Sequence, residues 1–166
     1  RELQRIGELL GRAIERDRLA EQVRRLAWRM GTATAGAGLG VWEYDLRTGE
    51  VIWDPTMYRI FGIDPGAETA TYETWRRCVL AEDLPRTEAR LNGAIAGEGS
   101  FDETFRIVRG DGEIRFVKGT VAVERDAEGR PSRAVGINAD VTEEHEVLLA
   151  LREAQAVGRL GDWTLD

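Results

Sequence analysis

The fold of this chain is decided by residues 100–142, whose sequence is SFDETFRIVRGDGEIRFVKGTVAVERDAEGRPSRAVGINADVT. Phe101, Glu103, Phe105 and Ile107 share one face if this segment is extended, which predicts a strand. Asp111-Gly112 is a tight-turn dipeptide, and a second turn follows with Gly and Pro. The stretch therefore predicts an antiparallel meander of three strands: residues 100–109, 113–124 and 133–141.

Two strands and several short helices are predicted before the meander. Arg47-Thr48-Gly49 is a hairpin-type turn between the two strands. Pro55 opens a helix and Gly62 ends it, the usual positions of these residues. We therefore expect one α+β domain over residues 39–141. The upstream elements are strands 41–46 and 50–54, the helix from Pro55, and helices 72–79 and 82–96.

Residues 1–31 are predicted to form a helix, because they lack Pro and carry apolar residues at helical spacing. The apolar residues form two offset stripes. A heptad-like pattern that shifts once is typical of a coiled coil with a stutter. A single amphipathic helix packing on its own domain explains the pattern equally well. The small residues from Gly31 to Gly38 predict the end of the helix. The stripes are Leu3, Ile6, Leu10 and Ala13, and then Leu19, Val23, Leu26 and Met30.

A second helix is predicted over residues 142–158. Asp140 and Glu143 have the spacing of a capping box, and Thr142 is an alternative cap. The following segment, LGDWTLD at 160–166, matches LGVWEYD at 39–45 in Leu, Gly, Trp and Asp. We interpret residues 159–166 as the start of a second domain of the same type.

Five segments in order resemble the PAS superfamily. In particular, they are similar to PAS modules with a C-terminal PAC motif in sensor histidine kinases and diguanylate cyclases. The resemblance implies a PAS fold, which is a five-stranded antiparallel sheet with short helices on one face. Two departures are Leu80-Ala81, where the family often has His-Pro, and Phe116, where Trp is usual. The segments are 40–50, Phe61-Gly62, 75–83, 106–116 and 136–142.

The composition argues against several classes of partner. The 23 Lys and Arg residues are interleaved with 30 Asp and Glu residues, and the net charge is −7. Nucleic-acid binding needs clustered cations, so it is not expected. No apolar run approaches the ~20 residues needed to cross a bilayer, so we expect no membrane contact in this segment. The single cysteine, Cys78, forms no intrachain disulfide and fits a reducing, cytoplasmic location.

We expect no catalytic or metal site. His145 is the only histidine, which excludes a multi-His metal site, and the residues after it lack the features of a phosphoacceptor box. It lies beyond the last strand, so an axial haem ligand is not expected. Cys78 lies outside any Asn-Cys-Arg-type motif, so covalent flavin photochemistry is not expected either. No cofactor is assigned from the sequence.

A small-molecule pocket is the remaining candidate site. Alternation places Trp42 and Tyr44 on one face of the first strand, as it does Phe105 and Ile107 on the third. These aromatic residues either line a cavity or only fill the core, and both interpretations stay open. Asn138 needs a hydrogen-bond partner if it points inward. By the resemblance Val117 and Asn138 point inward, and the helices contribute Phe61 and Trp75.

The resemblance implies signal input and relay, with Asp140 and Thr142 joining the last strand to the exit helix. The expected partners are a second copy of the chain, paired through the flanking helices, and a possible small-molecule ligand. Adjacent GAF or PAS domains and an output kinase or cyclase domain of the parent chain are also expected, with residues 1–31 similar to the exit helix of a GAF-type domain. The alternative is a ligand-free dimerisation or spacer module.

Overall fold

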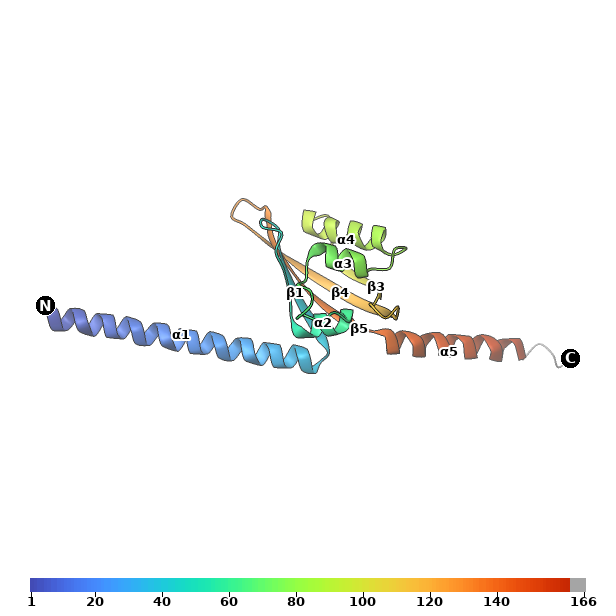
Figure 1. Cartoon of the computed structure of the whole chain (residues 1–166), viewed down its shortest axis with the longest axis horizontal. Helices are drawn as coiled ribbons and strands as arrows, with labels where there is room; N and C mark the ends of the chain where they lie inside the picture. The colour runs from blue at the N-terminus through green and yellow to red at the C-terminus, as the bar shows by residue number, and fades with distance from the viewer. Residues whose placement is uncertain (162–166) are drawn as a thin grey trace. The chain divides into compact units, whose positions relative to one another are not determined.

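The computed structural model describes residues 1–161 and divides the chain into two compact units, Arg1–Ala37 and Gly38–Asp166. The first unit is one helix, α1 (Glu2–Gly36), in which no residue is buried. In its described part, the second unit contains a five-stranded sheet and four helices. Figure 1 labels these elements except β2. The α+β fold expected from the sequence is therefore confirmed.

Helix α1 continues past residue 31, its predicted end, but it ends at Gly36, which lies within the stretch of small residues from Gly31 to Gly38. The Thr32 hydroxyl donates to the carbonyl of Trp28 (2.8 Å), and the Thr34 hydroxyl donates to that of Met30 (3.0 Å). Each hydroxyl donates to the carbonyl four residues earlier, so these bonds are compatible with helical geometry. The helix ends only where the N–H of Ala37 closes the last turn on Ala33 (3.1 Å).

The sheet joins the early hairpin to the late meander. All its pairs are antiparallel, in the order β2-β1-β5-β4-β3. The first and last strands, β1 and β5, lie side by side, with Trp42 opposite Gly136 and Gly40 opposite Asn138. The strands are β1 (Leu39–Asp45), β2 (Val51–Trp53), β3 (Phe101–Val108), β4 (Ile114–Arg125) and β5 (Pro131–Asp140).

Three short helices pack on one face of the sheet, and local signals explain their ends. Asp54 caps α2 by accepting the N–H of Met57 (2.7 Å), and Gly62 ends that helix with a left-handed φ of 68°. Thr71 and Thr74 form a capping box at α3. The helices of this unit are α2 (Pro55–Phe61), α3 (Tyr72–Cys78), α4 (Leu84–Ala96) and α5 (Thr142–Gly161).

The core lies between the sheet and these helices. On the predicted face of β3, Phe101, Phe105 and Ile107 are buried and Glu103 is half-buried, so that face is the one that packs on the core. The burial of these apolar side chains is the main stabilising contribution to the fold. The most deeply buried large side chains are Met57, Phe61, Phe105, Ile107 and Val117.

An ion pair fastens the start of α4 to β3, and it makes stability depend on pH. The carboxylate of Asp83 accepts the backbone N–H of Arg106 (2.8 Å) and its Nη2 (2.7 Å) and Nε (3.0 Å). These hydrogen bonds hold the pKa of Asp83 below its usual value. The stabilisation is therefore complete above the unfolded pKa of about 4, and it is lost as the pH falls through the lower folded pKa.

We expect Asp83→Asn to lower the free energy of unfolding by about 2 kcal/mol at neutral pH, because a charged acceptor of three hydrogen bonds is lost. Urea denaturation at pH 7 and at pH 3 measures this, and the difference from the unmodified chain should shrink at pH 3. Asp102→Asn is the control, because Asp102 makes only an exposed pair with Lys118. An equal loss at both pH values would contradict the assignment.

Candidate functional site

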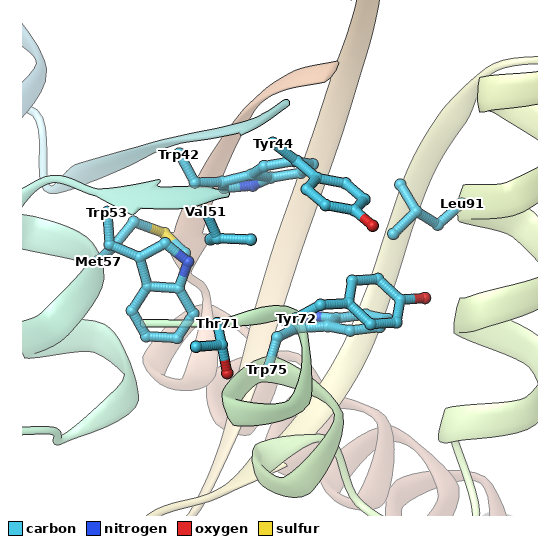
Figure 2. A pocket seen from close by; sticks show the side chains of 9 residues that line it. All are labelled: Trp42, Tyr44, Val51, Trp53, Met57, Thr71, Tyr72, Trp75 and Leu91. Carbon is cyan, nitrogen blue, oxygen red and sulfur yellow. The ribbon is translucent and has the colours of Figure 1, made fainter. Parts of the chain in front are cut away.

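A small cavity lies between the inner face of the sheet and the helices. Its volume is about 40 Å³. Figure 2 shows Trp42 and Tyr44, from β1, on one side and Tyr72 and Trp75, from α3, on the other. No charged side chain is among the residues that line it. These are Trp42, Tyr44, Val51, Trp53, Met57, Thr71, Tyr72, Trp75 and Leu91.

The indole of Trp42 is accommodated by a glycine on the neighbouring strand. Gly136 lies opposite Trp42 in the β1–β5 ladder. A Cβ atom on Gly136 would lie only 2.2 Å from Cε2 of Trp42. Real Cβ atoms do not approach so closely, so the ring occupies the space that the missing side chain leaves. The side of the cavity formed by β1 therefore depends on a residue of β5.

Asn138 also lies where a glycine leaves space, because a Cβ atom on Gly119 would lie 2.8 Å from its Oδ1. It is 3% exposed, and its ladder partners are Gly40 on β1 and Gly119 on β4. Its Oδ1 accepts the indole N–H of Trp42 at 3.3 Å, so the partner that a buried amide requires is present. Asn138 borders a second cavity of about 20 Å³, which shares Trp42, Trp75 and Leu91 with the first.

The helix side of the cavity is built on a three-residue spacing. Tyr72 and Trp75 lie on one face of α3 because residues three apart are neighbours on a helix. The ring of Tyr72 stacks on Tyr44, with centroids 5.5 Å apart. Its hydroxyl donates to Glu88 (3.0 Å), which also pairs with Arg76 (2.8 Å). Burial, together with this carboxylate, raises the pKa of Tyr72, so its hydroxyl stays protonated.

The structure separates the predicted pocket residues into three groups. Trp42, Tyr44 and Trp75 line the first cavity. Phe105 and Asn138 line the second, together with Trp42 and Trp75. The remaining three border neither cavity and belong to the fully buried core. These are Phe61, Ile107 and Val117.

Several lining residues were missed by sequence reasoning. Trp53 lies opposite Trp42 in the β1–β2 hairpin, so the register of that hairpin could have identified it. Tyr72 could have been found from its spacing to Trp75. Nothing local marks the others, because they reach the cavity through the tertiary fold. The missed residues are Val51, Trp53, Met57, Thr71, Tyr72 and Leu91.

The junction between β5 and α5 contains the two residues predicted for signal relay. The carboxylate of Asp140 accepts both the N–H (3.0 Å) and the hydroxyl (2.5 Å) of Thr142. Thr142 Oγ1 in turn accepts the backbone N–H of Phe116 on β4 (2.9 Å). Arg115 and Arg109 lie 3.5 Å and 3.7 Å from Asp140 Oδ2. The first turn of α5 is therefore bonded to two strands.

The capping box expected from Asp140 and Glu143 does not form: within residues 1–161, no hydrogen bond joins the two. The carbonyl of Val141 accepts the N–H of His145 (3.0 Å), so Val141 is the cap and Asp140 lies one residue too early. The ring of His145 stacks on Phe116, with centroids 4.0 Å apart. His145 is therefore half-buried and belongs to the junction.

The described residues offer little reactive chemistry. Cys78 is buried, and desolvation raises the pKa of its thiol, which disfavours the nucleophilic thiolate. Over residues 1–161 there is no group of three His, Cys, Asp or Glu side chains arranged to hold a metal ion. No helix in that range is both long and apolar enough to cross a membrane.

Comparisons with known proteins agree with this architecture. A family model described as PAS fold matches residues 50–138. The chain is 32% identical over 132 residues to the probable diguanylate cyclase DgcE of Escherichia coli, covering 79% of this chain and 12% of that protein. It is 28% identical over 117 residues to the sensor protein FixL of Bradyrhizobium diazoefficiens, covering 70% and 23%. The chain thus spans less than a quarter of these relatives.

A solved structure shows the same fold. It is a sensory box histidine kinase/response regulator from Burkholderia thailandensis, with a TM-score of 0.68 and 24% identity, and the match covers 79% of this chain and 98% of that one. The family model matches more than half of the chain. The strand order and the helices on one face of the sheet agree with that match. This chain belongs to the PAS-fold family.

Proposed function

We propose that this chain is a sensory and relay module of a multidomain signal-transduction protein. In this proposal, a ligand in the cavity, or a partner protein, changes how the flanking helices pair in a dimer. The observation that supports this proposal is that strand β5 contributes residues both to a cavity and to the junction with α5. Asn138 borders the second cavity, which adjoins the first, and Asp140, two residues later on the same face of β5, bonds to the first turn of α5. A shift of β5 would therefore reach the helix directly.

The dimer is proposed because both flanking helices expose apolar side chains. On α5 these include Leu148 (51%) and Leu151 (57%), and on α1 they form the two stripes. Leu10 and Leu19 are nine residues apart, which brings them to nearly opposite faces of a continuous helix at about 100° per residue. We assign the pairing to the second stripe, Leu19, Val23, Leu26 and Met30, which is nearer in sequence to the PAS domain.

The surroundings of the module are part of the same proposal. The relatives are four to eight times longer than the matched segment, as the coverage of 23% and 12% implies, so neighbouring domains are expected in the parent chain. We assign residues 1–31 to a signalling helix that follows a GAF-type domain, and residues 159–166, beyond the described ones in part, to the start of another PAS domain. Output activity as a kinase or a cyclase would belong to another domain of the parent chain, and this module itself would be non-catalytic. The buried free thiol of Cys78 suits a cytoplasmic location.

A ligand-free spacer is the second candidate, and the small cavity favours it. A volume of about 40 Å³ holds only water-sized groups unless side chains move. Native mass spectrometry of the purified chain separates the two functions. A dimer with extra non-covalent mass supports a chemical sensor, and a dimer of bare polypeptide supports a spacer. A monomer at micromolar concentration contradicts pairing through the helices.

Leu26→Asp is expected to convert the dimer to a monomer, because it places a charge in the proposed apolar contact. Native mass spectrometry or analytical ultracentrifugation measures the change. We expect the dimer dissociation constant to rise at least tenfold, which corresponds to a loss of about 1.4 kcal/mol in the free energy of association.

Trp28→Asp is the matched control. Trp28 is also apolar and exposed (70%). It lies two residues after Leu26, so its side chain is rotated by about 200° around the helix axis and projects from the opposite face. If Trp28→Asp dissociates the dimer and Leu26→Asp does not, the pairing face is assigned wrongly.

A further inference from the structure

Trp53 is a buried residue whose indole N–H has no acceptor within residues 1–161. Trp53 is 8% exposed, yet its N–H donates to no side chain or backbone group in the described part of the chain. The N–H of Trp42 is occupied by Asn138 and the hydroxyl of Tyr72 by Glu88, whereas the hydroxyl of Tyr44 makes no hydrogen bond within residues 1–161. In Figure 2 the nitrogen of Trp53 lies on the edge of its ring that faces the other lining side chains. Because no group of the described chain accepts this N–H and Trp53 lines the cavity, the donor is available to a ligand there.

The two sides of the cavity present aromatic ring faces. Trp42 and Tyr44 lie on one side and Tyr72 and Trp75 on the other, with the cavity between them (Figure 2). Aromatic groups prefer stacked or edge-to-face contacts with one another, so a flat ring is the ligand shape that this space favours.

The charge of the ligand follows from the same residues. A buried ion needs a charged or hydrogen-bonding partner, and no charged side chain lines the cavity. Glu88 and Arg76, which lie beside Tyr72, are paired with each other (2.8 Å). The positive end of the Trp53 N–H faces inward and disfavours a cation. Carboxylates, phosphates and ammonium groups are therefore all poor ligands.

We propose that the cavity binds a small, uncharged ring compound with one hydrogen-bond acceptor, which lies between Trp42 and Trp75 and accepts the N–H of Trp53. This inference rests on the proposed sensory function and gives its ligand a chemical class.

The size of the cavity limits the ligand to a single ring and requires the cavity to open. A benzene-sized ring fits a cavity of about 150 Å³, whereas this cavity has about 40 Å³. The half-buried Tyr44 and Tyr72 stack on each other, and their separation enlarges the space. The second cavity adjoins through Trp42 and Trp75, so a small movement of these rings joins the two volumes. Binding is therefore accompanied by rearrangement of the aromatic residues.

The test compares two probes of equal shape, acetophenone and α-methylstyrene, which differ in having a C=O acceptor or a C=CH₂ group. Calorimetric titration of the whole chain measures their affinities, and ¹⁵N NMR follows the indole N–H signals. We expect acetophenone to bind about fivefold more tightly, as one net hydrogen bond predicts. Its binding should move the Trp53 N–H signal downfield, and α-methylstyrene should not.

Trp53→Phe keeps an aromatic ring and removes the donor, so the preference for acetophenone should disappear. Trp28→Phe, on the exposed side of α1, is the matched control and should leave both affinities unchanged. If Trp53→Phe does not fold, the comparison of the two probes on the unmodified chain still decides.

Equal affinities, or an unmoved Trp53 signal on acetophenone binding, would overturn the assignment of the donor. Failure of both probes to bind would overturn the ligand class. The sensory function stands if native mass spectrometry of the same preparation shows a dimer with another bound molecule, so the two failures are distinguishable.

Discussion

Gly136→Ala is expected to lower the free energy of unfolding by about 3 kcal/mol or more, at the upper end for overpacked cores. The new methyl group would lie 2.2 Å from Cε2 of Trp42 and 2.5 Å from its Nε1. Neither atom is the flexible end of a side chain, so the whole indole must tilt away from β5. That movement breaks the hydrogen bond from Trp42 to Asn138 and changes the shape of both cavities.

Urea denaturation followed by circular dichroism measures the loss, and tryptophan fluorescence reports the displaced indole. Gly93→Ala is the control, since a Cβ at Gly93 in α4 meets nothing within 4 Å. It should stabilise the chain by about 0.5–1 kcal/mol, because alanine is the better helix former. If the two substitutions had equal effects, the space beside Trp42 would not matter to the fold.

The sheet was predictable because its signals are local. Alternation in β3, the Asp-Gly turn before β4 and the Pro and Gly at the ends of α2 each specify an element within a few residues. Thr32 and Thr34 show where such reasoning fails. Each was counted as a poor helix former, but its hydroxyl bonds to the helix instead of competing with it.

The cavity was only partly predictable because its residues meet through contacts distant in sequence. The pairing of Trp42 with Gly136 joins the first strand to the last, and no turn between them fixes that register. Tyr72, Thr71 and Leu91 come from helices whose positions on the sheet follow from core packing. Alternation of apolar and polar residues predicts which face of a strand is buried, but it does not predict which helix residues pack against that face.

The junction shows the same limit. The sequence pairs Asp140 with Glu143 as a capping box, whereas the structure pairs Asp140 with Thr142 and Thr142 with Phe116. Phe116 is distant in sequence and is brought close by the β4–β5 ladder, in which Val117 lies opposite Asp140. The hydroxyl of Thr142 is therefore shared between its own turn and a neighbouring strand, which is a tertiary arrangement.

Asp140→Ala is expected to release the first turn of α5 while the sheet remains folded. It removes the acceptor for both the N–H and the hydroxyl of Thr142 and leaves Arg115 without this carboxylate. The loss of a charged acceptor is worth about 1.5–3 kcal/mol locally. Backbone amides of α5 should therefore exchange with solvent about 10- to 100-fold faster, as hydrogen–deuterium exchange measures. Amides of β3 and β4 should keep their protection.

Asp111→Ala is the matched control, because Asp111 also accepts an N–H two residues ahead, that of Glu113 (2.9 Å), but lies in the exposed turn before β4. It should leave α5 unchanged. Thr142→Val tests the second half of the junction, since it keeps the shape of the side chain and removes the hydroxyl that accepts the Phe116 N–H. If both junction variants left α5 as protected as before, β5 and α5 would be joined by packing alone. A ligand beside Asn138 would then have no hydrogen-bonded path to the exit helix, and the relay proposal would lose its physical basis.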